Sequence, residues 1–317
     1  MLGLNDLLLG GLVPLVVAAI AFGIGWAASR HLAVAQTAGV IFGYAAGVTA
    51  LEARNSGIGV ALEKLTQPGV AHHWTPLLVL LSIVPAIIAA TLGKRRGLHW
   101  ILSGLICAAT PAWLLWGGKY LPGRELRESG FATSAWSGLE AVAILAAFAV
   151  MMLAAWYLWE AADSATAPRG RSLLAIMAVT GNAAAAGLTG SFVYAQLFGV
   201  LSASMGGCFV AGWLLKASTG PEAAAGPTIV LAGSLLLLAA CYSELRPWQA
   251  AGVWASIIVA AGWLPGLNRL PSKSQLAMRA IACLLPVSIV VSQAGLAFIE
   301  TQRQQQEERA SNPYLNL

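Results

Sequence analysis

Long apolar runs separated by short polar or charged stretches fill the chain from end to end. A helix that crosses a hydrocarbon layer of roughly 30 Å needs about 20 mostly apolar residues, and most of these runs have that length. Trp residues stand at many of their ends, as is typical of indole at a membrane interface. The runs are Leu7–Ala28, Leu32–Leu51, Trp74–Leu92, Leu98–Gly117, Ser137–Trp159, Ser172–Lys216, Ala223–Tyr242, Trp248–Leu264 and Arg279–Ile299.

One of these runs is too long for a single crossing. From Ser172 to Leu215 the sequence has no charged residue, and the stretch is about twice as long as one crossing requires. Glycines and serines between Gly187 and Ser204 weaken a helix there, so we expect the chain to turn within that interval. The pattern therefore predicts an all-α integral membrane protein, a bundle of about ten transmembrane helices.

The connections are too short for a soluble domain. We expect one polytopic transmembrane domain over residues 1–300, followed by an exposed, flexible tail over 301–317 that is rich in Gln and charge. A division near Pro168 gives halves 1–167 and 168–300 with about five helices each. Two equal halves are typical of transporters built from repeats, although the halves share no motif.

The connection after the second run contains a short amphipathic pattern. Ile58, Ala61, Leu62 and Leu65 recur at spacings of three and four, which predicts one apolar helical face. We expect an interfacial helix that ends before Pro68.

Composition supports the membrane assignment. Of the 317 residues 58% are hydrophobic and 10% charged, whereas a soluble domain carries about a quarter charged residues. The net charge of +5 lies in loops rather than in a basic patch, so it indicates topology and not nucleic-acid binding. The expected partners are the lipid bilayer and other membrane subunits, in a bacterial-type inner or plasma membrane.

Loop charges also suggest an orientation. The cluster from Lys94 to Arg96 favours the cytoplasm, and no Lys or Arg precedes the first helix. We therefore expect both termini on the outside.

Ionisable residues within spans usually mark ion paths or counter-ions, and most carboxylates here lie at span ends. Glu140 is the exception, because the pattern places it about one turn inside. Uncharged candidates lie in the long run, where Asn182, Thr189 and Gln196 accompany helix-weakening glycines. These residues favour either a solute site or, as commonly found, a packing contact in which Asn182 makes one interhelical hydrogen bond.

Gly39, Gly43 and Gly47 recur every fourth residue in the second run. Such a stripe lets another helix approach closely, and we interpret it as internal helix packing.

The histidines and cysteines do not form a ligand motif. With both termini outside, His31 and His99 share one membrane face while His72 and His73 lie at the other, and the four cysteines lack ligand spacing. We therefore expect no haem, no metal and no other cofactor. Motifs for nucleotide hydrolysis, serine hydrolases and zinc proteases are also missing from the sequence, which disfavours an enzyme.

Two functions are favoured over an intramembrane enzyme. The first is a transporter-like permease for a small or amphipathic solute, and the second is a non-catalytic membrane subunit or scaffold. A central water-accessible cavity lined by Asn182 and Gln196 favours the permease, whereas a solid, dry bundle favours the subunit.

Overall fold

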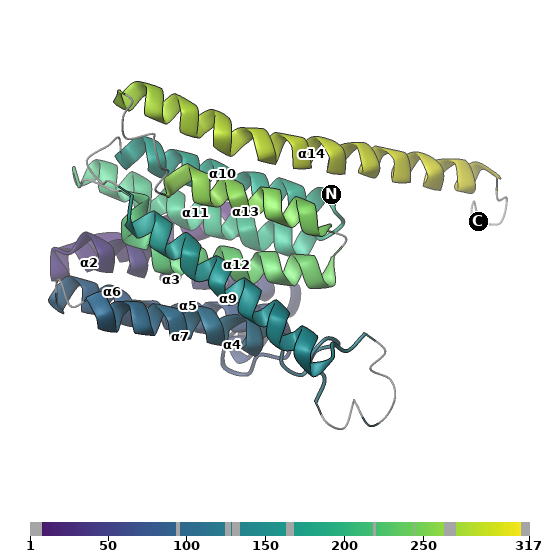
Figure 1. The fold of residues 1–317 in the computed structure, drawn as a ribbon, viewed down its shortest axis with the longest axis horizontal. Coiled ribbons are helices and arrows are strands. Elements are labelled where there is room, and N and C mark those ends of the chain that lie inside the picture. Colours follow the sequence, from purple (N-terminus) through teal and green to yellow (C-terminus); the bar gives the residue numbers. More distant parts are fainter. Residues whose placement is uncertain are drawn as a thin grey trace.

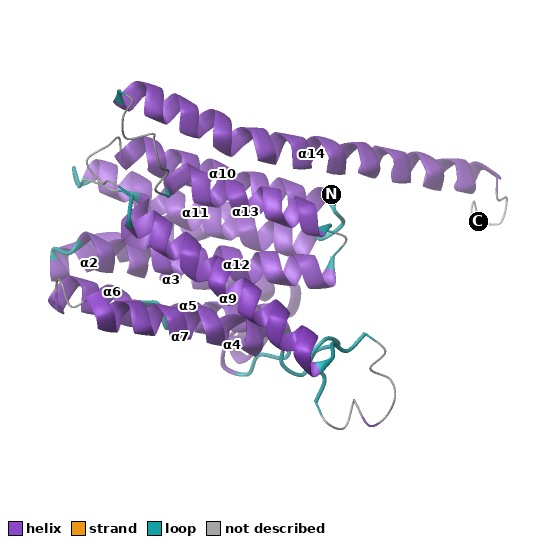
Figure 2. Cartoon of the chain, viewed as in Figure 1, coloured by secondary structure: helices purple, strands orange, loops and turns teal. Residues whose placement is uncertain are grey.

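The chain is almost entirely helical. The computed structural model describes residues 8–92, 96–123, 128, 134–162, 168–217, 220–243, 245–262 and 271–311. Over these residues it contains helices and connections but no strand, apart from one isolated bridge between Trp116 and Leu121 (Figure 2).

Fifteen helical elements follow one another in the described ranges. The first part of the chain forms η1 (Leu8–Leu12), α2 (Val13–Ser29), α3 (Leu32–Ser56), α4 (Ile58–Thr66), η2 (Ala71–Trp74), α5 (Thr75–Leu80), α6 (Ile83–Leu92), α7 (Arg96–Leu115) and α9 (Gly138–Glu160). The second part forms α10 (Pro168–Leu188), α11 (Phe192–Leu214), η3 (Pro221–Ala224), α12 (Ala225–Tyr242), α13 (Pro247–Ala261) and α14 (Ser272–Ser311).

The predicted all-α membrane bundle is confirmed. Among the described residues, 9 helical segments are long and apolar enough to cross a bilayer, with η2, α5 and α6 together forming one of them. The shorter apolar helix α13 adds a further candidate, so the estimate of about ten helices holds. Figure 1 shows that α10, α12 and α14 all end at the side of the bundle where α4 lies. We call this side the Glu52 end, because Glu52 lies in the last turns of α3, just before α4.

The third crossing is irregular where Pro85 interrupts it. α5 ends at Leu80 and α6 begins at Ile83, and the Val84 amide bonds the Leu81 carbonyl at 3.2 Å in a tight turn. Proline lacks an N–H and its ring clashes with the carbonyl four residues earlier, which here belongs to Leu81. The chain therefore turns more tightly just before the proline.

α12 forms the centre of the bundle. In its most apolar stretch 94% of the residues are buried, compared with 17% in the crossing that contains α2 and 22% in those of α9 and α14. The outer helices instead expose side chains such as Ile24, Val142 and Ile281. Such surfaces are typical of a protein whose solvent is lipid.

The break in the long apolar run lies within the predicted interval. α10 ends at Leu188 and α11 begins at Phe192, with Gly190 between them at φ +85°. Only glycine adopts that backbone conformation without a steric cost. The Ser191 amide bonds the Ala186 carbonyl at 3.1 Å and so satisfies one carbonyl of the last turn of α10.

The glycine stripe of α3 packs against two helices. A Cβ atom built on Gly43 would lie 2.6 Å from Ala18 Cβ of α2 and 2.9 Å from Ser204 Oγ of α11. One built on Gly47 would lie 2.6 Å from Val200 Cγ1 of α11, and one on Gly39 would meet Cys208 and Phe22. Helices from both parts of the chain therefore interlock, because α11 packs against α2 and α3.

Two buried arginines hold the end of α13. Arg171 and Arg279 are 1% and 3% exposed. Arg171 Nη1 donates to the Ala261 carbonyl at 3.3 Å, while Arg279 Nη1 donates to the carbonyls of Val259 and Gly262. Arg171 also forms an ion pair with Glu222 at 3.0 Å. Cations at a helix C-terminus satisfy its free carbonyls and oppose its dipole.

The expected flexible tail is helical over its first part. α14 continues through Ser311, and Arg303 Nε lies 3.2 Å from Glu307 Oε1 one turn later. Gln, Glu and Arg are good helix formers, so the helix does not need to stop at the membrane surface. Residues 312–317 lie outside the described ranges.

Candidate functional site

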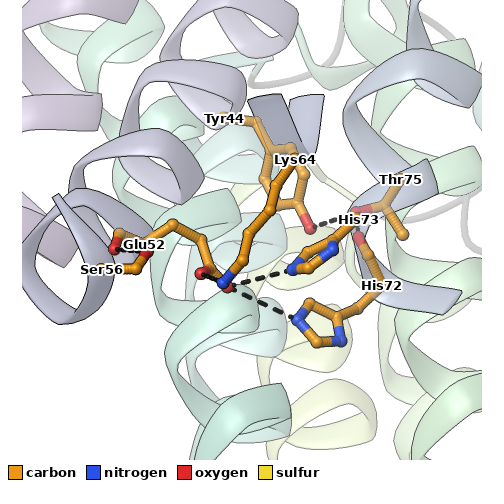
Figure 3. Close-up of polar contacts among 7 residues, drawn as sticks. All are labelled: Tyr44, Glu52, Ser56, Lys64, His72, His73 and Thr75. Carbon is orange, nitrogen blue, oxygen red and sulfur yellow. Dashed lines mark hydrogen bonds and ion pairs between the residues drawn. The ribbon is translucent and has the colours of Figure 1, made fainter. Parts of the chain in front are cut away.

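A compact polar cluster lies where α3, α4 and η2 meet at the Glu52 end (Figure 3). Lys64 Nζ donates to Glu52 Oε2 at 2.6 Å. The other carboxylate oxygen, Oε1, lies 3.2 Å from His73 Nε2 and 3.7 Å from His72 Nε2. One carboxylate from the last turns of α3 therefore faces an ammonium and two imidazoles.

Local backbone geometry brings Lys64 to this carboxylate. Gly57 ends α3 and begins α4 at φ +85°, so the chain folds back sharply after the transmembrane helix. The predicted short helix is confirmed as α4, with Ala61 buried and Ile58 exposed.

A hydroxyl chain fixes the turn that carries the histidines. Thr75 Oγ1 donates to the His72 carbonyl at 2.7 Å. Because its single hydrogen is used there, the Tyr44 hydroxyl is the donor in the 3.0 Å contact with Thr75 Oγ1. Tyr44 lies two turns before Glu52 on α3, so one helix supplies both the carboxylate and the anchor of η2.

His73 is the most enclosed member of the cluster. It is 6% exposed, and its Nδ1 atom has no hydrogen-bond partner among the described residues. One ligand atom from each of Glu52, His72 and His73 can be chosen so that all three lie within 4.8 Å of one another, which qualifies them as a candidate metal-binding group. A small cavity of about 10 Å³ adjoins Glu52, Lys64 and His73.

Sequence reasoning did not bring these residues together. The apolar pattern places Glu52 at the end of a span and His72 and His73 at one membrane face, without indicating a contact between them. The expectation of no metal rested on the lack of a ligand cluster, and the structure removes that reason. The sequence did contain an indication of this contact. Glu52 and His72 lie at the two ends of the same connection between crossings, so both must lie at the same membrane face.

The structure places the predicted solute-site residues in different environments. Asn182 is 1% exposed, and neither its Oδ1 nor its Nδ2 has a partner among the described residues. Thr189 is buried and donates back to the carbonyls of Ala185 and Ala186. Gln196 is half-buried on α11.

Glu140 lies in the first turn of α9 and is exposed. Its carboxylate accepts the Ser137 amide at 2.9 Å, while Ser137 Oγ accepts the Glu140 amide. This reciprocal capping box gives Glu140 a role at a helix start.

Thr189 lines a cavity of about 360 Å³ at the Glu52 end, whose wall is partly polar and partly apolar. The turn after α10, the start of α13 and the outer part of α14 enclose it. Its lining residues are Leu188, Thr189, Gly190, Arg246, Trp248, Gln249, Gln293, Ala294, Ala297, Phe298, Thr301 and Gln302. A second cavity of about 450 Å³ is lined by Trp74, Trp113, Trp116 and two alanines. Neither of these two cavities is lined by Asn182 or Gln196.

No protein-family model, curated protein or solved structure matches this chain. The geometry of the chain's own residues is therefore the only guide to its function.

His99, one of the conceivable haem ligands, has partners at both ring nitrogens. Nδ1 lies 3.3 Å from the Pro85 carbonyl, and Nε2 lies 3.0 Å from Glu160 Oε2. A carbonyl only accepts, so Nδ1 carries a hydrogen and Nε2 faces the carboxylate. Axial ligation of a haem by this residue would require breaking the contact with Glu160.

Proposed function

We propose that this multi-pass membrane protein is a transporter-like permease that admits a small or amphipathic solute through the cavity at the turn between α10 and α11. The single observation that carries the proposal is the pairing of that cavity, which adjoins the end of α10, with the fully buried Asn182 of α10, whose amide has no partner among the described residues. Thr189, Asn182 and Gln196 are its candidate solute-binding residues. Glu140 is the remaining candidate for solute binding, but its carboxylate is already used to cap the start of α9.

Helical geometry links the cavity to Asn182. Asn182 precedes Thr189 by seven residues, which is close to two full turns, and the Thr189 amide still bonds the Ala185 carbonyl, so Thr189 continues the face of α10 that carries Asn182. At 1.5 Å per residue, Asn182 lies about 10 Å deeper along the helix than the cavity wall. In this proposal the buried amide of Asn182 is the next polar side chain along α10 for a solute that enters at Thr189.

The energetics of Asn182 favour a role beyond packing. The packing interpretation assigns Asn182 an interhelical hydrogen bond, yet its amide has no partner among the described residues. Leaving a buried polar group unpaired costs about 1–3 kcal/mol. Such groups are few in native proteins, and a bound ligand or water is one of their explanations.

The cavity wall suggests the chemistry of the solute. Arg246 and Gln249 supply donors at the start of α13, and Phe298 and Trp248 supply apolar surface. The lining therefore fits a small solute with an anionic or hydrogen-bonding group and an apolar part.

Thermal stability of the detergent-purified protein, measured with a panel of small carboxylates, phosphates and amphiphiles, tests the proposal. We expect one class to raise the melting temperature of the wild type, and Arg246→Gln to abolish that increase. Arg303→Gln, which changes an exposed arginine of α14 outside the cavity lining, is the matched control and should retain it.

The Asn182→Leu variant separates binding from packing. Because the amide has no partner, we expect this variant to be at least as stable as the wild type but to lose the solute effect. A marked loss of stability with an unchanged solute effect would refute the proposed role of Asn182.

A non-catalytic membrane subunit is the second candidate, and two observations favour it: the burial of α12, and the absence of Asn182 and Gln196 from the linings of the two cavities described above. The centre of the bundle is occupied by a helix that is 94% buried over its most apolar stretch, and the two cavities described above lie elsewhere. Stoichiometric co-purification of another membrane protein from mild detergent, together with no stabilisation by any solute, would favour the subunit over the permease.

A further inference from the structure

We propose that Glu52, His72 and His73 form a binding site for a divalent transition-metal ion of the Zn²⁺ class at the Glu52 end of the bundle. Lys64 competes with the ion for the Glu52 carboxylate. This site is independent of the proposed solute cavity, because the two share no lining residue.

The donor set suits this class of ion. Two imidazoles and one carboxylate are ligands typical of zinc sites that keep a fourth position for water. Hard ions such as Mg²⁺ and Ca²⁺ prefer oxygen ligands, so two nitrogen donors disfavour them.

The distances are close to those around a tetrahedral ion. With metal–ligand bonds of about 2.0–2.2 Å, tetrahedral ligand atoms lie about 3.3–3.5 Å apart. The Glu52 Oε1 atom lies 3.2 Å from His73 Nε2 and 3.7 Å from His72 Nε2. The chosen ligand atoms of the two histidines lie within 4.8 Å of each other, so at most a small closure of the rings is needed around an ion.

The surroundings hold two of the ligands in place. The hydroxyl chain from Tyr44 through Thr75 fixes the backbone of His72, and Ser56 Oγ donates to the Glu52 carbonyl at 3.0 Å. These contacts restrain the backbone of both ligand residues. The adjacent cavity of about 10 Å³ has room for about one water molecule, which is the fourth ligand that a three-residue site requires.

Lys64 provides the positive charge at Glu52 in the structure. Its Nζ atom lies 2.6 Å from Oε2, and its side chain is 33% exposed on a flexible stem. A lysine at a helix end can swing its ammonium into water. A divalent ion can therefore replace it without rearrangement of the bundle, and removal of the ammonium should strengthen metal binding.

Zinc stoichiometry and affinity of the full-length protein provide the test. The detergent-purified protein is stripped with a chelator, titrated with Zn²⁺ and assayed by isothermal titration calorimetry and elemental analysis. We expect one ion per chain, at least about a tenfold loss of affinity in Glu52→Gln and His73→Ala, and a gain in Lys64→Met. His31→Ala is the control, because His31 lies outside the cluster, and it should bind as the wild type does.

The Lys64→Met variant keeps the proposal falsifiable if a ligand variant fails to fold. Its predicted gain in affinity follows from competition and would not arise from nonspecific binding at surface histidines. No Zn²⁺ binding by either wild type or Lys64→Met, or an equal loss in His31→Ala and His73→Ala, would overturn the site. Neither result bears on solute stabilisation through Arg246, so failure of one proposal is distinguishable from failure of the other.

Discussion

Replacement of Gly43 by alanine tests whether close packing of α3 against α2 and α11 holds the bundle together. In a helix interior this substitution ordinarily stabilises a protein by roughly 0.5–1 kcal/mol, because glycine has more backbone freedom to lose. At Gly43, however, the new Cβ would lie 2.6 Å from Ala18 Cβ and 2.8 Å from the Pro14 carbonyl oxygen. Ordinary contacts between carbon atoms are about 3.5–4.0 Å.

The clash cannot be relieved by a side-chain rotation. Ala18 Cβ and the Pro14 carbonyl move only with the backbone of α2, so α2 and α3 must separate by about 1 Å. A gap of that size forfeits a quarter to a half of each dispersion contact along the interface. Overpacking of this kind costs about 1–3 kcal/mol, which exceeds the gain in backbone entropy, so Gly43→Ala should be destabilised by up to about 2 kcal/mol.

Matched controls lie on α11. Nothing lies within 4 Å of a Cβ built on Gly199 or on Gly206, so alanine at either position should be neutral or stabilising. Unfolding in SDS, followed by circular dichroism and tryptophan fluorescence, measures the three variants in one series. A Gly43→Ala protein as stable as the Gly199→Ala and Gly206→Ala proteins would refute the packing argument.

Three further expectations concern charge, topology and cofactors. Arg171→Met should lower stability by about 1.5–3 kcal/mol in the same unfolding assay, because it removes charged hydrogen bonds at the end of α13, whereas exposed Arg169→Met should change it little. A cysteine introduced beyond Glu307 should react with an impermeant reagent applied outside intact cells, and labelling that needs permeabilisation would invert the topology. The absorption spectrum of the purified protein should lack a Soret band, and a stoichiometric band lost in His99→Ala would contradict that.

The sequence by itself determined the membrane fold and most element boundaries. Each crossing must satisfy its backbone hydrogen bonds internally, so every crossing is a helix and hydrophobic length alone locates it. The break between α10 and α11 followed from the same reasoning. A charge-free run twice as long as one crossing must turn, and glycine allows the turn with the least steric strain. The short helix α4 was likewise visible in its apolar spacing.

Sequence reasoning was less informative where a side chain's role depends on distant partners. Arg171 and Arg279 stand beside apolar runs, where a basic residue ordinarily indicates a loop charge, yet both are buried and hold the C-terminus of α13. They therefore carry little information on topology, and the predicted orientation rests mainly on the cluster from Lys94 to Arg96, most of which lies outside the described residues.

Only the tertiary structure decided which helix is central and which polar residues meet. In lipid a transmembrane helix is apolar on every side, so the sequence of α12 does not distinguish a core helix from a lipid-facing one. Likewise, Glu52, Lys64 and His73 lie on three separate elements, and their contact depends on how α4 folds back and how η2 docks on α3. Hydrophobic length determines where the chain crosses the membrane, whereas side-chain packing between crossings determines where its polar groups gather.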